Sequence, residues 1–365
     1  MSHQATTGSR AGDGSPATMQ QQGRISDSAP QGVMARGNLA ALDLGTNNCR
    51  LLIARPEGEG FVIVDAFSRI VRLGEGLAAN GRLSDAAIER TISALSVCAE
   101  KLRRRRVVLA RSVATEACRQ AANGAEFVGR VYDETGIKLD IISAREEARL
   151  AVLGCQSLLE PGEGPALIFD IGGGSTELAL LAEGAANGPG TMIRDWESAP
   201  WGVVSLTEAA SGHEDSPEGR AAAYAAMRET MRKAFAPFAA RLPANTTVRL
   251  LGTSGTVTTL ATVFLGLPRY DRAAVDGLVV PAAEMRAIAA RLACMSMAER
   301  KGLPCIGEER ADLVVAGCAI LESILDIWPA DRLGVADRGI REGILRGLLD
   351  SNALKRGRAR AGGQP

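Results

Sequence analysis

The sequence has almost no histidine and no closely spaced pair of cysteines. Only 2 of its 365 residues are histidines, His3 and His213. This argues against a Ser-His-Asp hydrolase, a histidine-bridged metal centre and a phosphohistidine mechanism. The 7 cysteines are scattered without a CxxC spacing, which argues against a zinc site and a disulfide framework. Any chemistry must therefore depend on carboxylates, hydroxyls, backbone amides and arginines.

The sequence also lacks a long apolar run and a net charge. No apolar stretch approaches the roughly 18 residues that a membrane span requires, and the N-terminus has no signal-peptide pattern. We therefore expect a soluble, cytoplasmic protein with neither membrane nor nucleic-acid partners. The 42 basic residues equal the 42 acidic ones, so binding to a polyanion would need local clusters of charge. One cluster, KLRRRR at 101–106, is more typical of a solvated helix end than of a polyanion track.

The length of the chain favours two domains. A single hydrophobic core stops growing near ~250–300 residues, whereas this chain has 365. Residues 1–37 and 351–365 have few large apolar side chains, and we expect both to be disordered tails. The rest divides into an N-terminal domain at 38–165 and a C-terminal domain at 166–350. Strands alternate with helices in both, which predicts an α/β fold with parallel pairing.

Each predicted domain opens with a strand, a glycine-containing turn and a returning strand. In the first domain the turn lies at 45–48, and FVIVDAFSRI predicts a third strand in the same meander. Ser84, Asn123 and Ser143 are expected to cap the N-termini of three helices. Long helices are expected at about 217–241, 282–294 and 308–328.

Three turns rich in Gly, Ser and Thr follow apolar strands, at 43–48, 170–176 and 252–256. The consecutive glycines of the second turn allow backbone N–H groups to approach an anion closely. Asp170 and Glu177 flank it and can hold a divalent cation or a water. A hairpin with glycines for geometry alone is the competing interpretation, but three such turns favour a phosphate site. This turn is neither a Walker A loop, because it lacks the Lys-Ser/Thr ending, nor a dinucleotide fingerprint, because a strand follows it.

Six stretches, in order along the chain, carry a family resemblance. They are LDLGTNNCRLLI, SVATEACRQAAN, IISAREEARL, LIFDIGGGSTELAL, LLGTSGTVTTL and VADRGIREGIL. Together they resemble the exopolyphosphatase and guanosine pentaphosphate phosphatase family of the actin-like superfamily. The resemblance implies two actin-like (ribonuclease H-like) domains with the site in the cleft between them. We expect the short two-domain form, without the His-Asp-type helical domain of larger members.

The resemblance also implies roles for individual residues. Glu147, the second acid of REEAR, matches the catalytic glutamate that orients and deprotonates the attacking water. Without that match it would read as an exposed acid near a helix N-terminus. Asp170 and Glu177 match acids that hold the divalent metal, Mg²⁺ or Mn²⁺, or its waters. The residues that match phosphate-binding positions are Asp43, Gly45, Thr46, Asn47, Arg119, Gly172, Gly173, Gly174, Ser175 and Thr176.

The implied function is that of an exopolyphosphatase, which removes terminal phosphate from inorganic polyphosphate with a water activated by Glu147. Phosphoryl transfer needs an in-line water and neutralisation of charge, which carboxylates, glycine amides, arginine and Mg²⁺ provide without histidine. Guanosine pentaphosphate, losing its 5′-phosphate, is a second candidate substrate. Two further hypotheses are an actin-like kinase, with GTSGT at 252–256 as one wall of an adenosine pocket, and a non-enzymatic phosphate or nucleotide sensor. A homodimer is among the expected assemblies.

Overall fold

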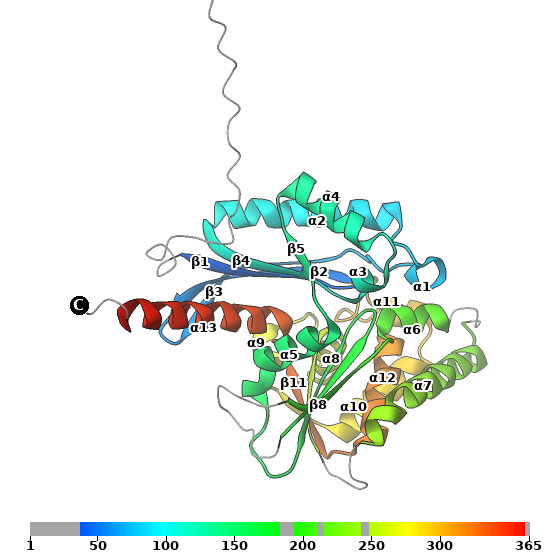
Figure 1. Cartoon of the computed structure of the whole chain (residues 1–365). Helices are drawn as coiled ribbons and strands as arrows, with labels where there is room; N and C mark the ends of the chain where they lie inside the picture. The colour runs from blue at the N-terminus through cyan, green and yellow to red at the C-terminus, as the bar shows by residue number, and fades with distance from the viewer. Residues whose placement is uncertain (1–36, 183–192, 211–214, 242–247, 362–365) are drawn as a thin grey trace, which may run out of the picture.

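The computed structural model describes residues 37–182, 193–210, 215–241 and 248–361, with side chains described as far as 351. His3, His213 and almost all of the predicted N-terminal tail at 1–37 lie outside these ranges. Within them, two β-sheets with their helices lie one above the other (Figure 1). The predicted α/β class with two actin-like domains is confirmed.

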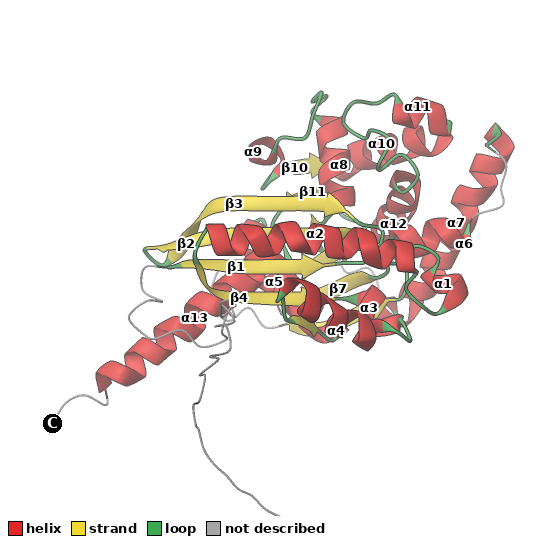
Figure 2. Ribbon diagram, turned by 90° about the horizontal axis from the view of Figure 1, so that it is seen from above, coloured by secondary structure: helices red, strands yellow, loops and turns green. Residues whose placement is uncertain are grey.

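The first sheet has five strands in the order β3-β2-β1-β4-β5. β1, β2 and β3 form the predicted antiparallel meander, while β4 and β5 extend it in parallel. α2 and α4 cover one face, as Figures 1 and 2 show, and α1 and α3 lie in the connections. The bounds are β1 Asn38–Leu44, β2 Asn48–Glu57, β3 Gly60–Ile70, α1 Leu77–Asn80, α2 Asp85–Arg104, β4 Val107–Ala114, α3 Glu116–Gln120, α4 Gly124–Thr135 and β5 Leu139–Ile141.

The second sheet has six strands in the order β10-β11-β9-β6-β7-β8. Its strands β8-β7-β6-β9-β11 repeat the pairing directions of β3-β2-β1-β4-β5. Asp43 and Asp170 are therefore equivalent, each next to last in the first strand of its sheet. The bounds are β6 Ala166–Ile171, β7 Thr176–Leu181, β8 Ile193–Ala199, α6 Val203–Ala209, α7 Pro217–Ala239, β9 Arg249–Thr253, α8 Gly255–Phe264, α9 Arg272–Val275, β10 Val279–Pro281, α10 Ala282–Cys294, α11 Met297–Lys301, α12 Val314–Ile327 and β11 Arg332–Ala336.

The predicted helix caps are confirmed in part. Ser84 and Ser143 accept hydrogen bonds from the backbone at the starts of α2 and α5 (Ala144–Cys155). Asn123 precedes α4, but its side chain does not cap that helix. Its amide instead exchanges two hydrogen bonds with the backbone of Leu83, so it ties α4 to the loop before α2. The helix expected at 308–328 begins only at Val314, because turns occupy 308–313.

The last helix, α13 (Ile340–Ala361), returns to the first sheet and packs beside α5 (Figure 1). Its Ile344 shares a buried cluster with Leu39 of β1 and Leu52 of β2. α13 continues past residue 350 into the predicted C-terminal tail. The predicted boundary at 165 and 166 stays a prediction, although the sheets change there. In the part of the chain that the structure describes, no helix is long and apolar enough to cross a membrane.

Candidate active site

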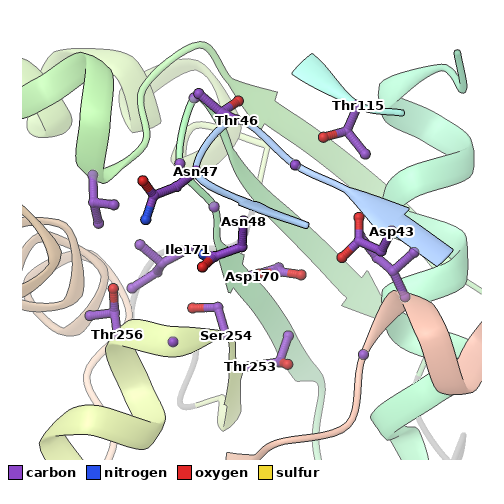
Figure 3. Close-up of a pocket in the computed structure, with 18 of the residues that line it drawn as sticks. Asp43, Thr46, Asn47, Asn48, Thr115, Asp170, Ile171, Thr253, Ser254 and Thr256 are labelled. Carbon is purple, nitrogen blue, oxygen red and sulfur yellow. The ribbon is translucent and has the colours of Figure 1, made fainter. Parts of the chain in front are cut away.

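A cleft with a cavity volume of about 130 Å³ lies between the two sheets. The turns at the carboxyl ends of β1, β6 and β9 line it, together with the start of α13. Figure 3 shows Asp43 on one wall and Asp170 and Ser254 on the other. In α/β sheets ligands commonly bind beyond the carboxyl ends of strands. Here the carboxyl ends of strands from both sheets face the same cleft.

The two glycine turns have the same geometry and touch across the cleft. Gly45 N donates to Asn48 O and Gly172 N donates to Ser175 O, each at 2.9 Å. A Cβ atom on Gly173 would lie 2.9 Å from Cβ of Thr46. Glycine is therefore required at position 173, because a side chain there would keep the two walls apart. The two walls of the cleft are in contact at this point.

Six acidic residues line the same cleft, and four of them, Asp43, Glu147, Asp170 and Glu177, have raised pKa values. Burial, followed by the nearby charge of Asp43, raises the pKa of Asp170 to about 6. Burial, followed by the charge of Asp170, raises the pKa of Glu177 to about 7. The pKa of Glu147 is also raised, mainly by burial and then by Glu177, while Arg119 opposes the rise. Perturbed acids that share one cleft are typical of a functional site.

Glu147 is held in place by Arg119. It lies in the first turn of α5, where the Ser143 cap fixes the helix start, and it is only 6% exposed. Arg119 Nη1 donates to Glu147 Oε2 and to the carbonyl oxygen of Ile142, both at 2.8 Å. Arg119 Nε donates to Glu116 Oε2 at 2.8 Å. The guanidinium therefore fixes the orientation of Glu147.

The donors of the cleft fit a divalent cation. Asp43 Oδ1 is buried and accepts no hydrogen bond from the described residues, so one carboxylate oxygen is free to ligate. Nowhere in the described part of the chain do three or more Asp, Glu, His or Cys side chains form a complete ligand group by themselves. Mg²⁺ is usually bound by one or two carboxylates together with waters and substrate phosphates, so an incomplete protein ligand set suits it.

Most of the residues predicted to form the site do line the cleft, and two do not. Arg119 lies behind Glu147, where its hydrogen bonds to Glu116 and Glu147 occupy it. Thr176 is completely buried, and its hydroxyl donates to the carbonyl oxygen of Trp201 at 2.7 Å. The predicted residues that line the cleft are Asp43, Gly45, Thr46, Asn47, Glu147, Asp170, Gly172, Gly173, Gly174, Ser175 and Glu177.

Three arginines of the cleft were missed by the sequence analysis: Arg50, Arg310 and Arg341. Arg50 and Arg341 are close enough to Asp43 to lower its pKa against the effect of burial. Arg50 and Arg341 stand in the quoted stretches LDLGTNNCRLLI and VADRGIREGIL, so a signal for them existed. Ser254, in the third turn, has φ of 98° and a buried hydroxyl without a partner among the described residues.

Comparison with known proteins gives consistent matches over most of the chain. The model of the Ppx/GppA phosphatase family matches residues 52–352. Exopolyphosphatase 2 of Mycobacterium tuberculosis is 33% identical over 329 residues, which are 86% of this chain and 99% of that protein. The guanosine-5′-triphosphate,3′-diphosphate pyrophosphatase of Aeromonas salmonicida is 31% identical over 314 residues, 86% of this chain and 60% of that protein.

Solved structures also match over most of the chain. The Aquifex aeolicus PPX-GPPA enzyme has 32% sequence identity and a TM-score of 0.68, with 85% of this chain and 99% of that chain covered. An exopolyphosphatase-like protein has 28% identity and a TM-score of 0.74, with 86% and 98% covered.

Proposed function

The chain belongs to the Ppx/GppA phosphatase family, and on that premise we propose that it hydrolyses the terminal phosphoanhydride bond of inorganic polyphosphate. The observation that carries the proposal is the position of Glu147, a buried carboxylate held by Arg119 in a cleft lined by two glycine turns. The similarity of the chain to exopolyphosphatase 2, over 86% of its length, supports the choice of substrate.

Backbone amides and arginines would bind the terminal phosphate. The glycines at 172–174 offer N–H groups without obstructing side chains, as an anion requires, and the turn at 45–48 lines the same cleft. Arg50, Arg310 and Arg341 add positive charge along the cleft. Such preorganised donors stabilise the charge that develops on the equatorial oxygens during phosphoryl transfer.

We propose that Glu147 is the general base. A new bond forms between the water oxygen and the terminal phosphorus, and the bridging P–O bond breaks. The proton of the water passes to the carboxylate of Glu147, and a shortened polyphosphate leaves with the bridging oxygen. The raised pKa of Glu147 suits this task, because a base works best when its pKa lies near the working pH.

We further propose that Asp170 and Glu177 would hold Mg²⁺ or Mn²⁺, directly or through its waters. When bound, the cation supplies positive charge that neutralises the phosphate oxygens. Both acids share the cleft with Glu147, and the unpartnered Oδ1 of Asp43 is available to a water bound to the ion. We also propose a cytoplasmic location, which cell fractionation tests, and a homodimeric assembly, which light scattering tests.

Guanosine pentaphosphate is the second candidate substrate. Apolar side chains of Ile70, Val203 and Leu313 line part of the cleft, and a nucleoside can use such contacts whereas inorganic polyphosphate cannot. The similarity to the Aeromonas salmonicida pyrophosphatase supports the same choice. The 5′-phosphate would then be removed by the same groups.

One assay tests these proposals. Phosphate release is measured from long-chain polyphosphate, tripolyphosphate and guanosine pentaphosphate, with the wild type and Glu147→Gln. We expect release from polyphosphate and a loss of about 10²- to 10⁴-fold in kcat in the variant, with binding retained. No release from any of the three would refute both candidates, and calorimetric binding of ATP with phosphate transfer to an acceptor would favour a kinase. Unchanged activity in Glu147→Gln would refute the role of Glu147.

A further inference from the structure

We infer that Arg72 and Asp312 form a latch that holds the two walls of the cleft together and are positioning residues for the proposed hydrolysis. Arg72 Nη1 and Asp312 Oδ2 are 2.9 Å apart, and the residues are 240 positions apart in the chain. Arg72 follows the last residues of β3 in the first sheet, whereas Asp312 precedes α12, which packs on the second. The two side chains are 36% and 28% exposed, so the ion pair is only partly screened by solvent.

The backbone around Arg72 is bound to the turn at 45–48, which is the proposed first phosphate turn. The amide nitrogens of Val71 and Arg72 both donate to the carbonyl oxygen of Asn47, at 2.9 and 3.1 Å. Gly74 N donates to the carbonyl oxygen of Thr46 at 2.9 Å. Arg72 has a positive φ of 47°, which is unfavourable for a residue with a side chain and persists only where surrounding contacts enforce it. The position of Arg72 is thus coupled to that of Thr46 and Asn47.

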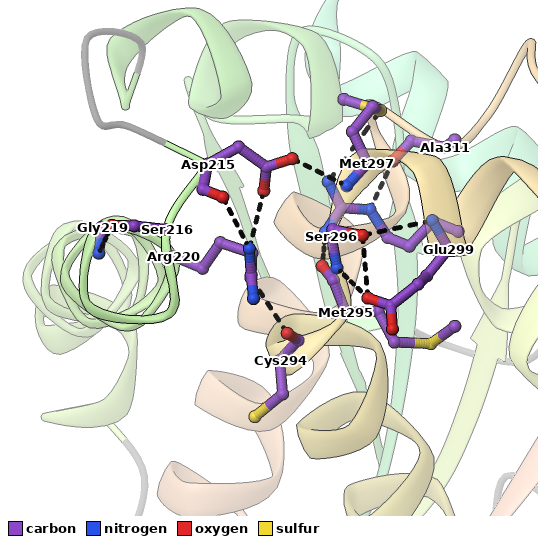
Figure 4. Close-up of polar contacts among 11 residues, drawn as sticks. Asp215, Ser216, Gly219, Arg220, Cys294, Met295, Ser296, Met297, Glu299 and Ala311 are labelled. Carbon is purple, nitrogen blue, oxygen red and sulfur yellow. Dashed lines mark hydrogen bonds and ion pairs between the residues drawn. The ribbon is translucent and has the colours of Figure 1, made fainter.

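The segment that carries Asp312 is bound to the opposite wall by Arg300. Arg300, only 7% exposed, donates from Nε to the carbonyl oxygen of Ala311 at 2.9 Å and from Nη1 to that of Met295. Figure 4 shows the surrounding contacts, in which the carboxylate of Asp215 accepts a hydrogen bond from Met297 N at 3.1 Å. The short helix α11 and the turns after it are thereby fixed at both ends.

The same turns carry a residue of the cleft. Arg310, two positions before Asp312, lines the cleft and donates from Nη1 to Thr259 Oγ1 at 2.9 Å. Asp312 Oδ1 is buried and has no hydrogen-bond partner among the described residues, so the carboxylate depends on Arg72 for its direct ion pair. Loss of Arg72 would leave the partly buried carboxylate of Asp312 without that partner, which is unfavourable.

A second contact crosses between the walls next to the latch. Gly76 N donates to Glu208 Oε1, on α6, at 2.9 Å. The segment 71–76 therefore contacts the first phosphate turn on one side and α6 and Asp312 on the other. Gly173 of the opposite wall packs against Thr46 of the first phosphate turn. The position of this turn therefore depends on how closely the two walls approach.

Charge reversal and a charge swap test the latch. The variants are Arg72→Glu, Asp312→Lys and the double variant with both, and the control is Arg82→Glu, an exposed arginine without an ion pair to the described residues. KM and kcat are measured with polyphosphate, and the radius of gyration of the ligand-free protein is measured by small-angle X-ray scattering. We expect each single reversal to raise KM by about twofold to fivefold, which is the range for a partly exposed ion pair. Each should also enlarge the radius of gyration. The double variant should recover most of both changes, and the control should change neither.

The latch is refuted if both single variants keep the wild-type KM and radius of gyration, or if the double variant is as impaired as the two single changes combined. Asp312→Asn, which keeps the shape of the side chain, serves as a milder variant if a reversal fails to fold, and it must show the same directions of change. The kinetic measurement rests on the proposed function, whereas the scattering measurement does not. A wild type that hydrolyses no polyphosphate would therefore refute the function and leave the latch to be decided by scattering.

Discussion

Arg119 Nη1 lies 2.8 Å from Glu147 Oε2, so the proposed base is paired with a cation that does not itself line the cleft. Arg119 stabilises the ionised form of Glu147 and so lowers a pKa that burial raises. In Arg119→Met the pKa of Glu147 should rise further. Since a base acts in its ionised form, the acidic limb of the pH profile of kcat should move to higher pH.

The matched control for Arg119→Met is Arg149→Met, on the same helix as Glu147. Arg149 pairs with Glu146, which is next to Glu147 in the chain but is itself partly exposed. This variant should keep the wild-type pH profile. A shift of equal size in both variants would contradict the positioning role of Arg119.

Asp170 and Glu177 should make the metal-free protein less stable as the pH rises. Their pKa values in the folded chain, about 6 and about 7, lie above the usual values of ~4. The unfolded chain therefore ionises first, and stability falls between about pH 4 and 7. At pH 8 with a chelator, Asp170→Asn should be more stable than the wild type by about 1–2 kcal/mol in urea unfolding, and the difference should vanish at pH 4.

Added Mg²⁺ gives the complementary result. It should stabilise the wild type at pH 8 and have little effect on Asp170→Asn, because a bound cation favours the ionised acids. Asp140→Asn, which removes an exposed acid from β5, is the control. A metal-free Asp170→Asn that is less stable than the wild type at pH 8 would show that burial does not destabilise this carboxylate.

Much of the site could be predicted because its signals are local. The glycines of 172–174 and the acid before them predict a turn that lines the cleft without knowledge of any distant residue. Thr176 could have been excluded from the same sequence, because neighbouring residues of a strand point to opposite faces and Glu177 faces the cleft. The family resemblance supplied Glu147, which the residues alone did not distinguish from an exposed acid.

Other parts of the structure depend on contacts between distant segments. The return of α13 to the first sheet joins Ile344 to Leu39, and no local pattern specifies which sheet a final helix will cover. The pairing of Arg72 with Asp312 likewise joins residues 240 positions apart. The burial of Arg119 behind Glu147 also depends on tertiary pairing, since α3 and α5 follow β4 and β5, which are neighbours in the first sheet.

Asp65 explains the basic cluster at 101–106 as a structural feature of the fold. Its carboxylate binds Lys101 and Arg105, and the hydrogen bond from Lys101 is the main cause that lowers its pKa to about 2. A lowered pKa means that the stabilisation is complete above pH ~4 and is lost as the pH falls towards 2. Asp65→Asn should therefore cost about 1–2 kcal/mol at pH 7 and almost nothing near pH 2, after allowance for solvent screening.

Urea unfolding of Asp65→Asn at several pH values checks this expectation. Asp133→Asn, an exposed acid on α4, is the control and should be close to the wild type throughout. Activity on polyphosphate should be unchanged in both variants. A large loss of polyphosphate binding in Asp65→Asn would instead favour a substrate track along the cluster.

The contact between α5 and α13 should tolerate no side chain at Gly154. A Cβ atom there would lie 1.9 Å from the carbonyl oxygen of Gly339, which is backbone and cannot move aside alone. Gly154→Ala must push α5 away from the start of α13, at a cost of about 1–3 kcal/mol in the free energy of unfolding. Gly347, also on α13, would place a Cβ with nothing within 4 Å. Gly347→Ala should therefore stabilise the protein by up to ~1 kcal/mol, through helix propensity alone.

Urea unfolding of the two variants, together with activity, separates close packing from propensity. Because Gly339 lines the cleft, Gly154→Ala should also lower kcat, whereas Gly347→Ala should leave it unchanged. If Gly154→Ala were as stable and as active as the wild type, the helices would not be packed as closely as their glycines indicate. The closed arrangement of the cleft depends on that packing, since α13 carries Arg341 into the cleft from the first turn after Gly339.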